Sequence, residues 1–401
     1  MIELDEALQQ ILAALPAPPT ETVRLTEAAG RILAGTVHSG VDLPPFDNSA
    51  MDGYALRAAD VSSAAEAEPV KLQLRGRIAA GEVFRGELGT GECVRLFTGS
   101  PLPGGADAVV MQEDTRVVAD QAGEVLVCDP VRPGENVRLR GSDVKRLAVL
   151  AAAGSVLDPG KLSLLAATGV ADVRVGQQPR VGLLATGSEL CEAGSPLASG
   201  QIYESNRVAL AELIRRAGGL PEVYPLVPDD LAATRHALQR AVDECDMVVT
   251  SGGVSVGEMD FVKTAWEQLG GTLEFWKVAM RPGKPFVFGR WRDSYLFGLP
   301  GNPVSAFVTF LLLVRPALLR WQGATDLALP AVPGVLTEPL ANPGERRHFV
   351  RVTVNSSGEV RSAGLQASHA LASLAVGNGL VDLAPRSTLA KGSAVKVLCW
   401  S

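Results

Sequence analysis

The sequence predicts a multi-domain chain of the α/β plus β class, and three observations support this. Its 401 residues exceed what one hydrophobic core organises, so we expect roughly two to four domains. Strand-like and helix-like segments alternate over residues 180–319, which is typical of a largely parallel sheet with helices on both faces. Short apolar runs separated by Gly and Pro fill residues 70–140 and the tail beyond 330, which indicates two smaller β-rich modules.

The individual elements follow from the same patterns. Residues 1–15 are amphipathic with early acidic residues and no basic start, which predicts a helix rather than a signal peptide. Strands are expected in the first half at 70–78, 92–97, 108–112, 124–128 and 136–140, with a helix at 159–168. The middle is expected to hold strands at 180–184, 222–227, 246–250, 286–288 and 295–299, and helices at 206–217, 231–244, 258–269 and 303–319. The tail is expected to hold strands at 349–354, 379–383 and 394–400.

Composition excludes several classes of protein. The net charge is 37 − 44 = −7, which argues against a nucleic-acid partner. The five cysteines are odd in number and never form a CxxC pair, and the four histidines form no HxH or HExxH cluster, so neither a disulfide framework nor a zinc site is expected. The apolar run 304–314 ends at Arg315-Pro316 and is too short for a bilayer. We therefore expect a cytoplasmic protein without a membrane partner.

Four polar, glycine-bearing runs are the chemical features of the chain: 45–55, 97–107, 250–260 and 299–305. The run at 45–55 has neither a period of two nor one of 3.6, so we interpret it as an ordered loop presenting carboxylates, or as a capped turn. Residues 186–189, 250–260 and 299–305 follow predicted strands. Ligands of parallel sheets bind beyond such strand ends.

Two segments suit anions. The glycines of 251–260 allow backbone N–H groups to converge on a phosphate, while Glu258 and Asp260 suit a magnesium ion; a capped strand-to-helix turn is the alternative. Lys277, Arg281 and Lys284 surround a Pro-Gly turn, which favours an oxyanion cradle over a solvated surface turn. No Ser-His-Asp triad or Cys-His pair is readable, so electrostatic catalysis with a metal is favoured over a covalent intermediate.

Six motifs carry a resemblance over nearly the whole chain: DNSAMDGYA at 47–55, FTGSPLPGGADAVVMQED at 97–114, ATGSEL at 185–190, DMVVTSGGVSVGEMDF at 246–261, FWKVAMRPGKPFVFG at 275–289 and FGLPGNPVSAF at 297–307. Together they resemble the molybdopterin molybdenumtransferase family (MoeA-type proteins and the E domain of gephyrin-like proteins). The resemblance implies an elongated homodimer with a linker or helical domain (1–45 and 141–176), an inserted β-rich domain (46–140), a mixed α/β molybdopterin-binding domain (177–326) and a C-terminal β-barrel-like domain (327–401).

The implied reaction inserts molybdate into adenylylated molybdopterin, with Mg²⁺-dependent release of AMP. The implied catalytic residues are Asp52, Thr98, Glu189, Asp229 and Asp260, of which Asp229 and Asp260 would also bind the metal. The implied residues for molybdate and the pterin phosphate are Ser251, Gly252, Gly253, Ser255, Lys277, Arg281, Lys284, Pro285, Pro300, Asn302, Pro303, Ser305, Arg351 and Ser368.

Three departures from the family pattern affect this assignment. Arg281 stands where Lys is common, Val352 where Gly often follows the arginine, and Ala367 where Gly usually precedes Ser368. Either Arg347 or Arg351 is therefore the tail ligand.

The resemblance also implies an active site shared between two subunits, with molybdopterin adenylyltransferase and molybdoenzyme-maturation proteins as candidate partners. Two other functions compete with molybdenum insertion. One is the preceding step, adenylyl transfer from ATP to molybdopterin. The other is a scaffold or pterin-binding protein without turnover.

Overall fold

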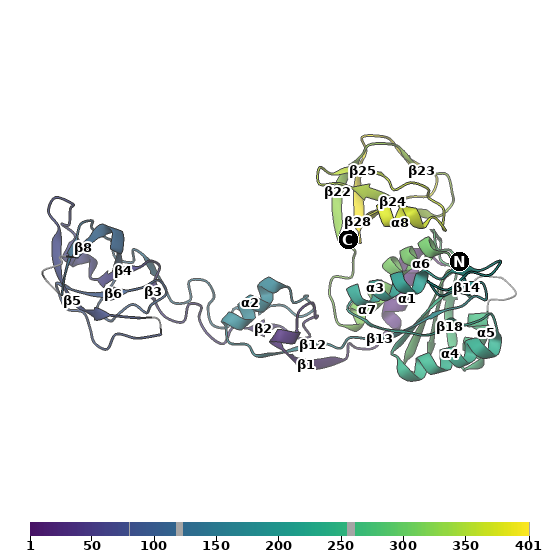
Figure 1. Cartoon of the computed structure of the whole chain (residues 1–401), viewed down its shortest axis with the longest axis horizontal. Helices are drawn as coiled ribbons and strands as arrows, with labels where there is room; N and C mark the ends of the chain where they lie inside the picture. The colour runs from purple at the N-terminus through teal and green to yellow at the C-terminus, as the bar shows by residue number, and fades with distance from the viewer. Residues whose placement is uncertain (80, 118–122, 255–260, 401) are drawn as a thin grey trace. The chain divides into compact units, whose positions relative to one another are not determined.

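A computed structural model describes residues 1–79, 81–117, 123–254 and 261–400 (Figure 1). Contacts divide the chain into two units, which are described separately. Unit 1 comprises Met1–Gly35, Ala153–Leu157 and Val173–Ser401, and unit 2 comprises Thr36–Ala152 and Asp158–Asp172. Ser255 and Asp260 lie outside the described residues. The fourfold domain division inferred above stays a prediction.

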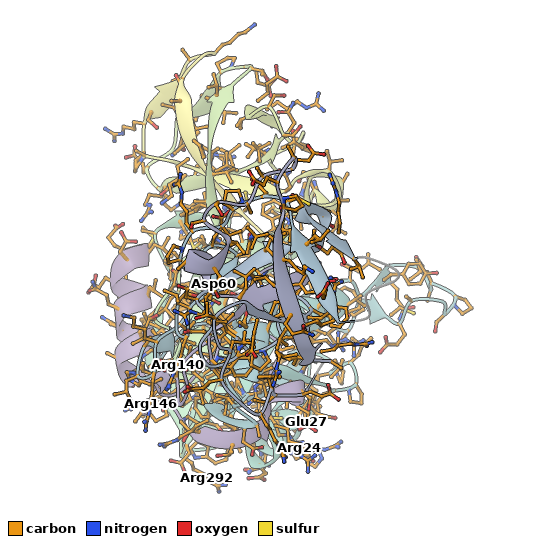
Figure 2. All side chains as sticks on the ribbon, turned by 90° about the vertical axis from the view of Figure 1, so that its left-hand side faces the viewer. Arg24, Glu27, Asp60, Arg140, Arg146 and Arg292 are labelled. Atoms are coloured by element: carbon orange, nitrogen blue, oxygen red, sulfur yellow. The ribbon has the colours of Figure 1, made fainter. Side chains whose placement is uncertain are left out.

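The centre of unit 1 is a six-stranded sheet, as the alternating pattern predicts. Its order is β16 (Leu220–Val223), β13 (Arg180–Ala185), β17 (Met247–Ser251), β21 (Ser294–Leu299), β20 (Val287–Trp291) and β18 (Thr272–Trp276). The first four strands are parallel, and the last two pairings are antiparallel. β20 runs antiparallel to β21 because a tight turn connects the two strands; the exposed Arg292 in this turn has φ +53° (Figure 2).

Two details of this sheet differ from the sequence prediction. The strand expected over 222–227 is shifted and ends at Val223, because Pro225 has no N–H for further pairing. β18 was not anticipated as a strand; it forms the antiparallel edge beside β20. Its Phe275 stacks on Phe286, a contact between segments that sequence patterning does not reveal.

Helices cover both faces of the sheet, as predicted (Figure 1). α4 (Leu231–Glu244) and α5 (Phe261–Gln268) pack on one face through Leu238 and Trp266. α1 (Leu4–Ala14), α3 (Asn206–Arg216) and the helix beginning at Pro303 pack on the other. Although residues 1–45 are expected in the linker domain, α1 contributes Leu4, Ala7 and Ile11 to this core.

The helix from Pro303 continues past Arg315-Pro316 to Trp321, which confirms the helix expected over 303–319 and extends it by two residues. It consists of α6 (Pro303–Thr309), a π-helical turn (Phe310–Val314) and α7 (Arg315–Trp321). The wider π turn directly before Pro316 accommodates a residue that cannot donate an N–H. The 19-residue stretch is long and apolar enough to cross a membrane, but 72% of its most apolar window is buried within the protein, as in a core helix.

A closed five-stranded barrel forms the C-terminal part, which confirms the expected β-barrel-like domain. Its strands are β24 (Arg347–Val354), β25 (Glu359–Ser362), β22 (Ala331–Leu336), β28 (Ala394–Cys399) and β26 (Gly379–Leu383), and β24–β26 pairing closes the ring. β19 (Met280–Arg281) pairs with β24 and so joins the cationic segment to the barrel. Smaller elements of unit 1 are β1 (Thr20–Arg24), β12 (Asp172–Gly176), β14 (Leu190–Cys191), β15 (Ile202–Tyr203), β23 (Leu340–Asn342), β27 (Ser387–Leu389), α8 (Leu371–Val376) and a 3-10 turn at Leu25–Glu27.

Unit 2 contains the predicted β-rich segment. Its main sheet has the order β7 (Ala108–Met111), β4 (Gly53–Leu56), β6 (Glu92–Leu96), β5 (Val70–Arg77), β9 (Glu124–Val127) and β8 (Thr115–Val117). The interpretation of 45–55 as a loop is wrong at its end, since β4 begins at Gly53 inside this sheet. Its other elements are β2 (Val37–His38), β3 (Asn48–Ser49), β10 (Val137–Arg138), β11 (Val149–Ala151), α2 (Pro159–Ala167) and 3-10 turns at Ala58–Val61 and Gln112–Asp114.

Candidate functional site

Three loops meet at one edge of the α/β sheet. They follow β13, β17 and β21, which are parallel neighbours, so their carboxyl ends lie together as predicted. Backbone hydrogen bonds join the loops: Thr186 N–H donates to the carbonyl of Ser251 at 3.0 Å, and Gly252 N–H donates to the carbonyl of Leu299 at 3.1 Å. The three segments therefore form one surface.

Two glycines allow this close approach. Gly252 and Gly253 have φ of +91° and +68°, in the left-handed region that favours glycine. A Cβ on Gly252 would lie 2.6 Å from the carbonyl oxygen of Thr186, and one on Gly253 would lie 2.7 Å from the Thr186 hydroxyl. The β17 loop can thus pack on the β13 loop only without side chains at these positions.

The loops enclose a cavity of about 570 Å³. Its wall combines apolar and polar residues, namely Ala185, Thr186, Glu189, Leu190, Ile202, Tyr203, Glu204, Ser205, Asn206, Ser251, Gly301, Asn302, Pro303, His369 and Leu371. The hydroxyl of Thr186 is buried without a hydrogen-bond partner in the part of the chain that the structure describes. A flat, partly polar ligand fits such a wall, since it needs apolar contact and a few hydrogen bonds.

The candidate carboxylates Glu189 and Asp229 are attached to one turn. Asp229 Oδ2 accepts from Ser188 N–H at 2.9 Å, and Asp229 N–H donates to the Ser188 hydroxyl at 2.9 Å. Glu189 is exposed at the cavity rim. Among residues 1–79, 81–117, 123–254 and 261–400, no three His, Cys, Asp or Glu side chains gather closely enough for a metal ion.

The cationic segment connects β18 to β20 of the sheet and pairs with the barrel through β19. Lys277 has φ +79°, an unusual conformation for a residue with a side chain, and its ammonium lies 3.8 Å from the centre of the Trp276 ring. Arg281 and Lys284 are exposed, and Arg281 pairs with β24 through β19. Strain at Lys277 is the kind that functional sites retain.

The tail arginines differ in their surroundings. Arg351 is 0% exposed; its Nε donates to the Ser373 hydroxyl at 2.7 Å and its Nη2 to the carbonyl of Leu365 at 2.8 Å. Its Nη1 is buried without a partner among the described residues. Burial, with the nearby charge of Arg281, lowers the pKa of Arg351 to about 10.

Arg347, in contrast, is bound by two carboxylates. Its Nη1 lies 3.0 Å from Asp5 and its Nη2 lies 2.5 Å from Asp382. Of these two arginines, Arg347 is neutralised by carboxylates, whereas Arg351 has a buried Nη1 without a partner among the described residues and lies near the charge of Arg281.

The start of α6 is completed from the tail. Asn302 occupies the N-cap position of the helix, but its side chain makes no capping hydrogen bond. Val304 N–H donates instead to the carbonyl of Ser368 at 3.1 Å. Pro300 and Ser305, which flank this helix start in the sequence, are buried. Pro285 of the cationic segment is half-buried.

Asp52 and Thr98 form a separate pair within unit 2. Asp52 Oδ1 accepts from both the backbone N–H and the hydroxyl of Thr98, each at 2.8 Å. These hydrogen bonds, backbone first, lower the pKa of the Asp52 carboxyl, and the nearby Arg95 adds to the effect. The pair therefore presents a carboxylate in its ionised form.

Comparison with known proteins decides the family. Family models match the MoeA N-terminal region (domain I and II) at 2–169, a probable molybdopterin binding domain at 182–320 and the MoeA C-terminal region (domain IV) at 333–400. A molybdopterin molybdenumtransferase of Haemophilus influenzae is 39% identical, with 99% of this chain and 98% of that protein covered. The chain belongs to the molybdopterin molybdenumtransferase family.

Further relatives agree. Molybdopterin molybdenumtransferase 2 of Mycobacterium tuberculosis is 40% identical over 94% of each chain. A crystal structure of the molybdopterin biosynthesis MoeA protein of Pyrococcus horikoshii has a TM-score of 0.84 at 34% identity and covers 100% of this chain and 99% of that one. The protein is therefore an enzyme of this family with its multi-domain fold.

Within this molybdenumtransferase fold, the structure brings together only part of the predicted set. Glu189, Ser251, Asn302 and Pro303 line the one cavity, and Asp229 binds the adjoining turn. Sequence reasoning missed Thr186, Glu204, Asn206 and His369 as cavity residues. Thr186 lies within the ATGSEL motif at 185–190, but the other three could be found only from contacts between segments far apart in the sequence.

Proposed function

We propose that this enzyme inserts molybdenum from molybdate into adenylylated molybdopterin and releases AMP. The observation that carries the proposal is the meeting of three glycine-bearing or polar strand-end loops around one cavity of about 570 Å³. The names of the curated relatives supply the general reaction, and the adenylylated substrate and the leaving AMP come from the family resemblance. The cytoplasm is the proposed location.

Charge supports the division of roles. Molybdate and a pyrophosphate repel each other, so an enzyme that joins them needs cations near both. Lys277, Arg281 and Lys284 would hold molybdate, with Arg351 offering its unused Nη1 from the tail. The Ser251 hydroxyl and the Gly253 backbone N–H would contact the pterin phosphate, because hydroxyl and N–H groups suit phosphate oxygens. The Gly252 N–H is already bonded to the carbonyl of Leu299, so Gly252 would contribute only close approach of the backbone.

Mg²⁺ fits the residue types proposed for it. Asp229 supplies carboxylate oxygens, which are the ligands that this cation prefers, and Asp260, which lies outside the described residues, would supply the second carboxylate. When bound, the cation would neutralise charge that develops on the phosphate oxygens. Asp229 is fixed in place by its two hydrogen bonds with Ser188.

A direct assay tests this function. Purified protein is mixed with adenylylated molybdopterin, molybdate and Mg²⁺, and AMP is measured by chromatography. Asp260→Ala is expected to abolish AMP release with an unchanged thermal unfolding midpoint. Asp243→Ala, which changes an exposed carboxylate on α4, is the matched control and should behave as wild type.

The outcomes separate the alternatives. Full activity of Asp260→Ala would remove the metal role of that residue. Formation of adenylylated molybdopterin from ATP would favour adenylyl transfer instead. Pterin binding by the wild type without any AMP release would favour the scaffold.

A further inference from the structure

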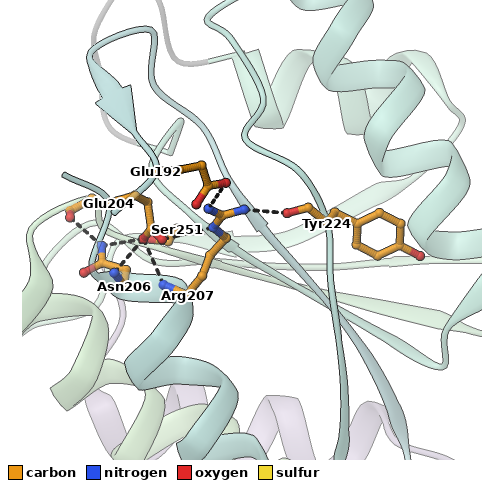
Figure 3. A network of polar contacts seen from close by, with 7 residues as sticks. Glu192, Glu204, Asn206, Arg207, Tyr224 and Ser251 are labelled. Atoms are coloured by element: carbon orange, nitrogen blue, oxygen red, sulfur yellow. Dashed lines mark hydrogen bonds and ion pairs between the residues drawn. The ribbon is translucent and has the colours of Figure 1, made fainter. Parts of the chain in front are cut away.

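Asn206 connects two of the loops that form the cavity. It is the first residue of α3, and its side-chain Nδ2 donates to the hydroxyl of Ser251 at 2.7 Å and to the carbonyl of Gly301 at 2.7 Å (Figure 3). Ser251 ends β17, whereas Gly301 follows β21. A single amide therefore fixes the separation of two loops that come from different strands.

A buried ionic network holds Asn206 in place. The Glu204 carboxylate is 7% exposed and accepts from the backbone N–H groups of Asn206 at 2.5 Å and Arg207 at 2.9 Å. The Arg207 guanidinium donates back to Glu204 at 3.0 Å (Figure 3). It also donates to the carbonyl of Tyr224 at 2.7 Å and to Glu192 at 2.6 Å.

This network satisfies each charge that it buries. Hydrogen bonds between ionised partners are among the stronger ones in proteins, and a buried charge without a partner is costly. The start of α3 is consequently rigid, and the Asn206 amide has a fixed direction toward the two loops.

The direction of the hydrogen bonds has a chemical consequence. Because the Ser251 oxygen accepts from Nδ2, the hydrogen of that hydroxyl is available to donate elsewhere. Ser251 lines the cavity, as does Asn206. The amide thus sets Ser251 as a hydrogen-bond donor toward an acceptor oxygen in the cavity.

We propose that Asn206 is a positioning residue of this enzyme, which orients the Ser251 hydroxyl and holds the Gly301 loop so that the cavity binds the phosphate of the pterin substrate. This inference rests on the proposed function. It assigns a role to a residue that makes its contribution through Ser251 and Gly301.

The test uses the isosteric variant Asn206→Asp. A carboxylate at this position accepts the Ser251 hydrogen instead of donating, and it repels the Gly301 carbonyl. We expect KM for adenylylated molybdopterin to rise about ten- to a hundred-fold, the cost of a misdirected buried hydrogen bond, while kcat changes far less. Asn355→Asp makes the same chemical change at an exposed site in the barrel and should leave KM unchanged.

A second variant extends the test. Ser251→Ala keeps the bond between Asn206 and Gly301 but removes the donor, so its KM should also rise. Because both changes remove the same donor, the double variant is expected to be little worse than the more impaired single variant. Fully additive losses, or a fall in kcat with unchanged KM, would overturn the positioning role.

The controls distinguish the two proposals. If wild-type protein releases no AMP, the proposed function fails before Asn206 is considered. If wild type is active and Asn206→Asp has the same KM, the inference about Asn206 is wrong. If Asn206→Asp does not fold, as judged by circular dichroism, Asn206→Ala replaces it, because it removes both hydrogen bonds without adding a charge: a raised KM supports the positioning role and an unchanged KM refutes it.

Discussion

His348 is an ionisable residue that the fold keeps neutral. It lies on β24, is 3% exposed, and neither ring nitrogen has a hydrogen-bond partner within the described residues. Burial, followed by the charges of Arg281, Arg351 and Arg346, lowers its pKa to about 4 from the usual 6.5. The unfolded chain therefore takes up a proton at this histidine before the folded chain does.

This difference predicts a pH-dependent stability. The contribution of neutral His348 is complete above pH 6.5 and is lost as the pH falls from 6.5 to about 4. At about 1.4 kcal/mol per pKa unit, the full loss is about 3 kcal/mol. His348→Leu should therefore show a smaller fall in unfolding midpoint than wild type between pH 7.5 and 5 in urea titrations.

The exposed His236 provides the matched control. His236→Leu also removes a histidine but leaves His348 in place, so it should retain the wild-type pH dependence. An equal loss of stability in wild type and His348→Leu would contradict the role assigned to the buried imidazole.

At the level of elements, β4 shows why one interpretation of the sequence was wrong. Gly53, Tyr54, Ala55 and Leu56 are all buried, because the sheet has apolar residues on both faces. Such a strand has no alternation of polar and apolar residues, so a search for a period of two does not identify it as a strand. Of the preceding polar residues, Asn48 and Ser49 form the short strand β3, so the loop is confined to the residues on either side of it.

The position of Gly53 gives a prediction for this strand. A Cβ there would lie 1.9 Å from the carbonyl oxygen of Val110 on β7, so backbone would have to move. Gly53→Ala should destabilise unit 2 by about 1–3 kcal/mol or more, measured by chemical denaturation. Gly40→Ala in the same unit has open space around the new methyl group and should be nearly neutral, and equal stabilities would contradict this account.

Helices and strands whose start and residue pattern are both determined within their own segment were predictable. α4 begins at Leu231 as expected, because Asp230 caps it by accepting from Ala233 N–H at 2.8 Å. The meeting of the strand-end loops was also predictable, since parallel strands end at a common edge. The π turn within the predicted helix at 303–319 and the place of Asn206 in the cavity were not predictable. No local pattern marks the π turn, and the Asn206 amide depends on the carbonyl of Gly301, far away in the sequence.

At the scale of the whole molecule, we propose the homodimer with a shared active site that the family resemblance implies, and this assembly makes a testable prediction. Asp52 belongs to unit 2, whereas position 260 falls within the residue range of unit 1, and the family resemblance implies that the Asp52–Thr98 pair serves the partner subunit. Asp52→Ala and Asp260→Ala should each be inactive as homodimers. Because a symmetric dimer has two equivalent sites, a mixed dimer of the two variants would contain one site with both defects and one with neither.

Co-expression with two different affinity tags, followed by tandem purification, isolates that mixed dimer. Its AMP release is expected to be about half that of wild type, since one of two equivalent sites is intact. A doubly tagged Asp260→Ala dimer is the control and should remain inactive. An inactive mixed dimer would show instead that both carboxylates act within one subunit, because each of its sites would then carry one defect. A purified wild-type chain that stays monomeric in solution would also exclude the shared site.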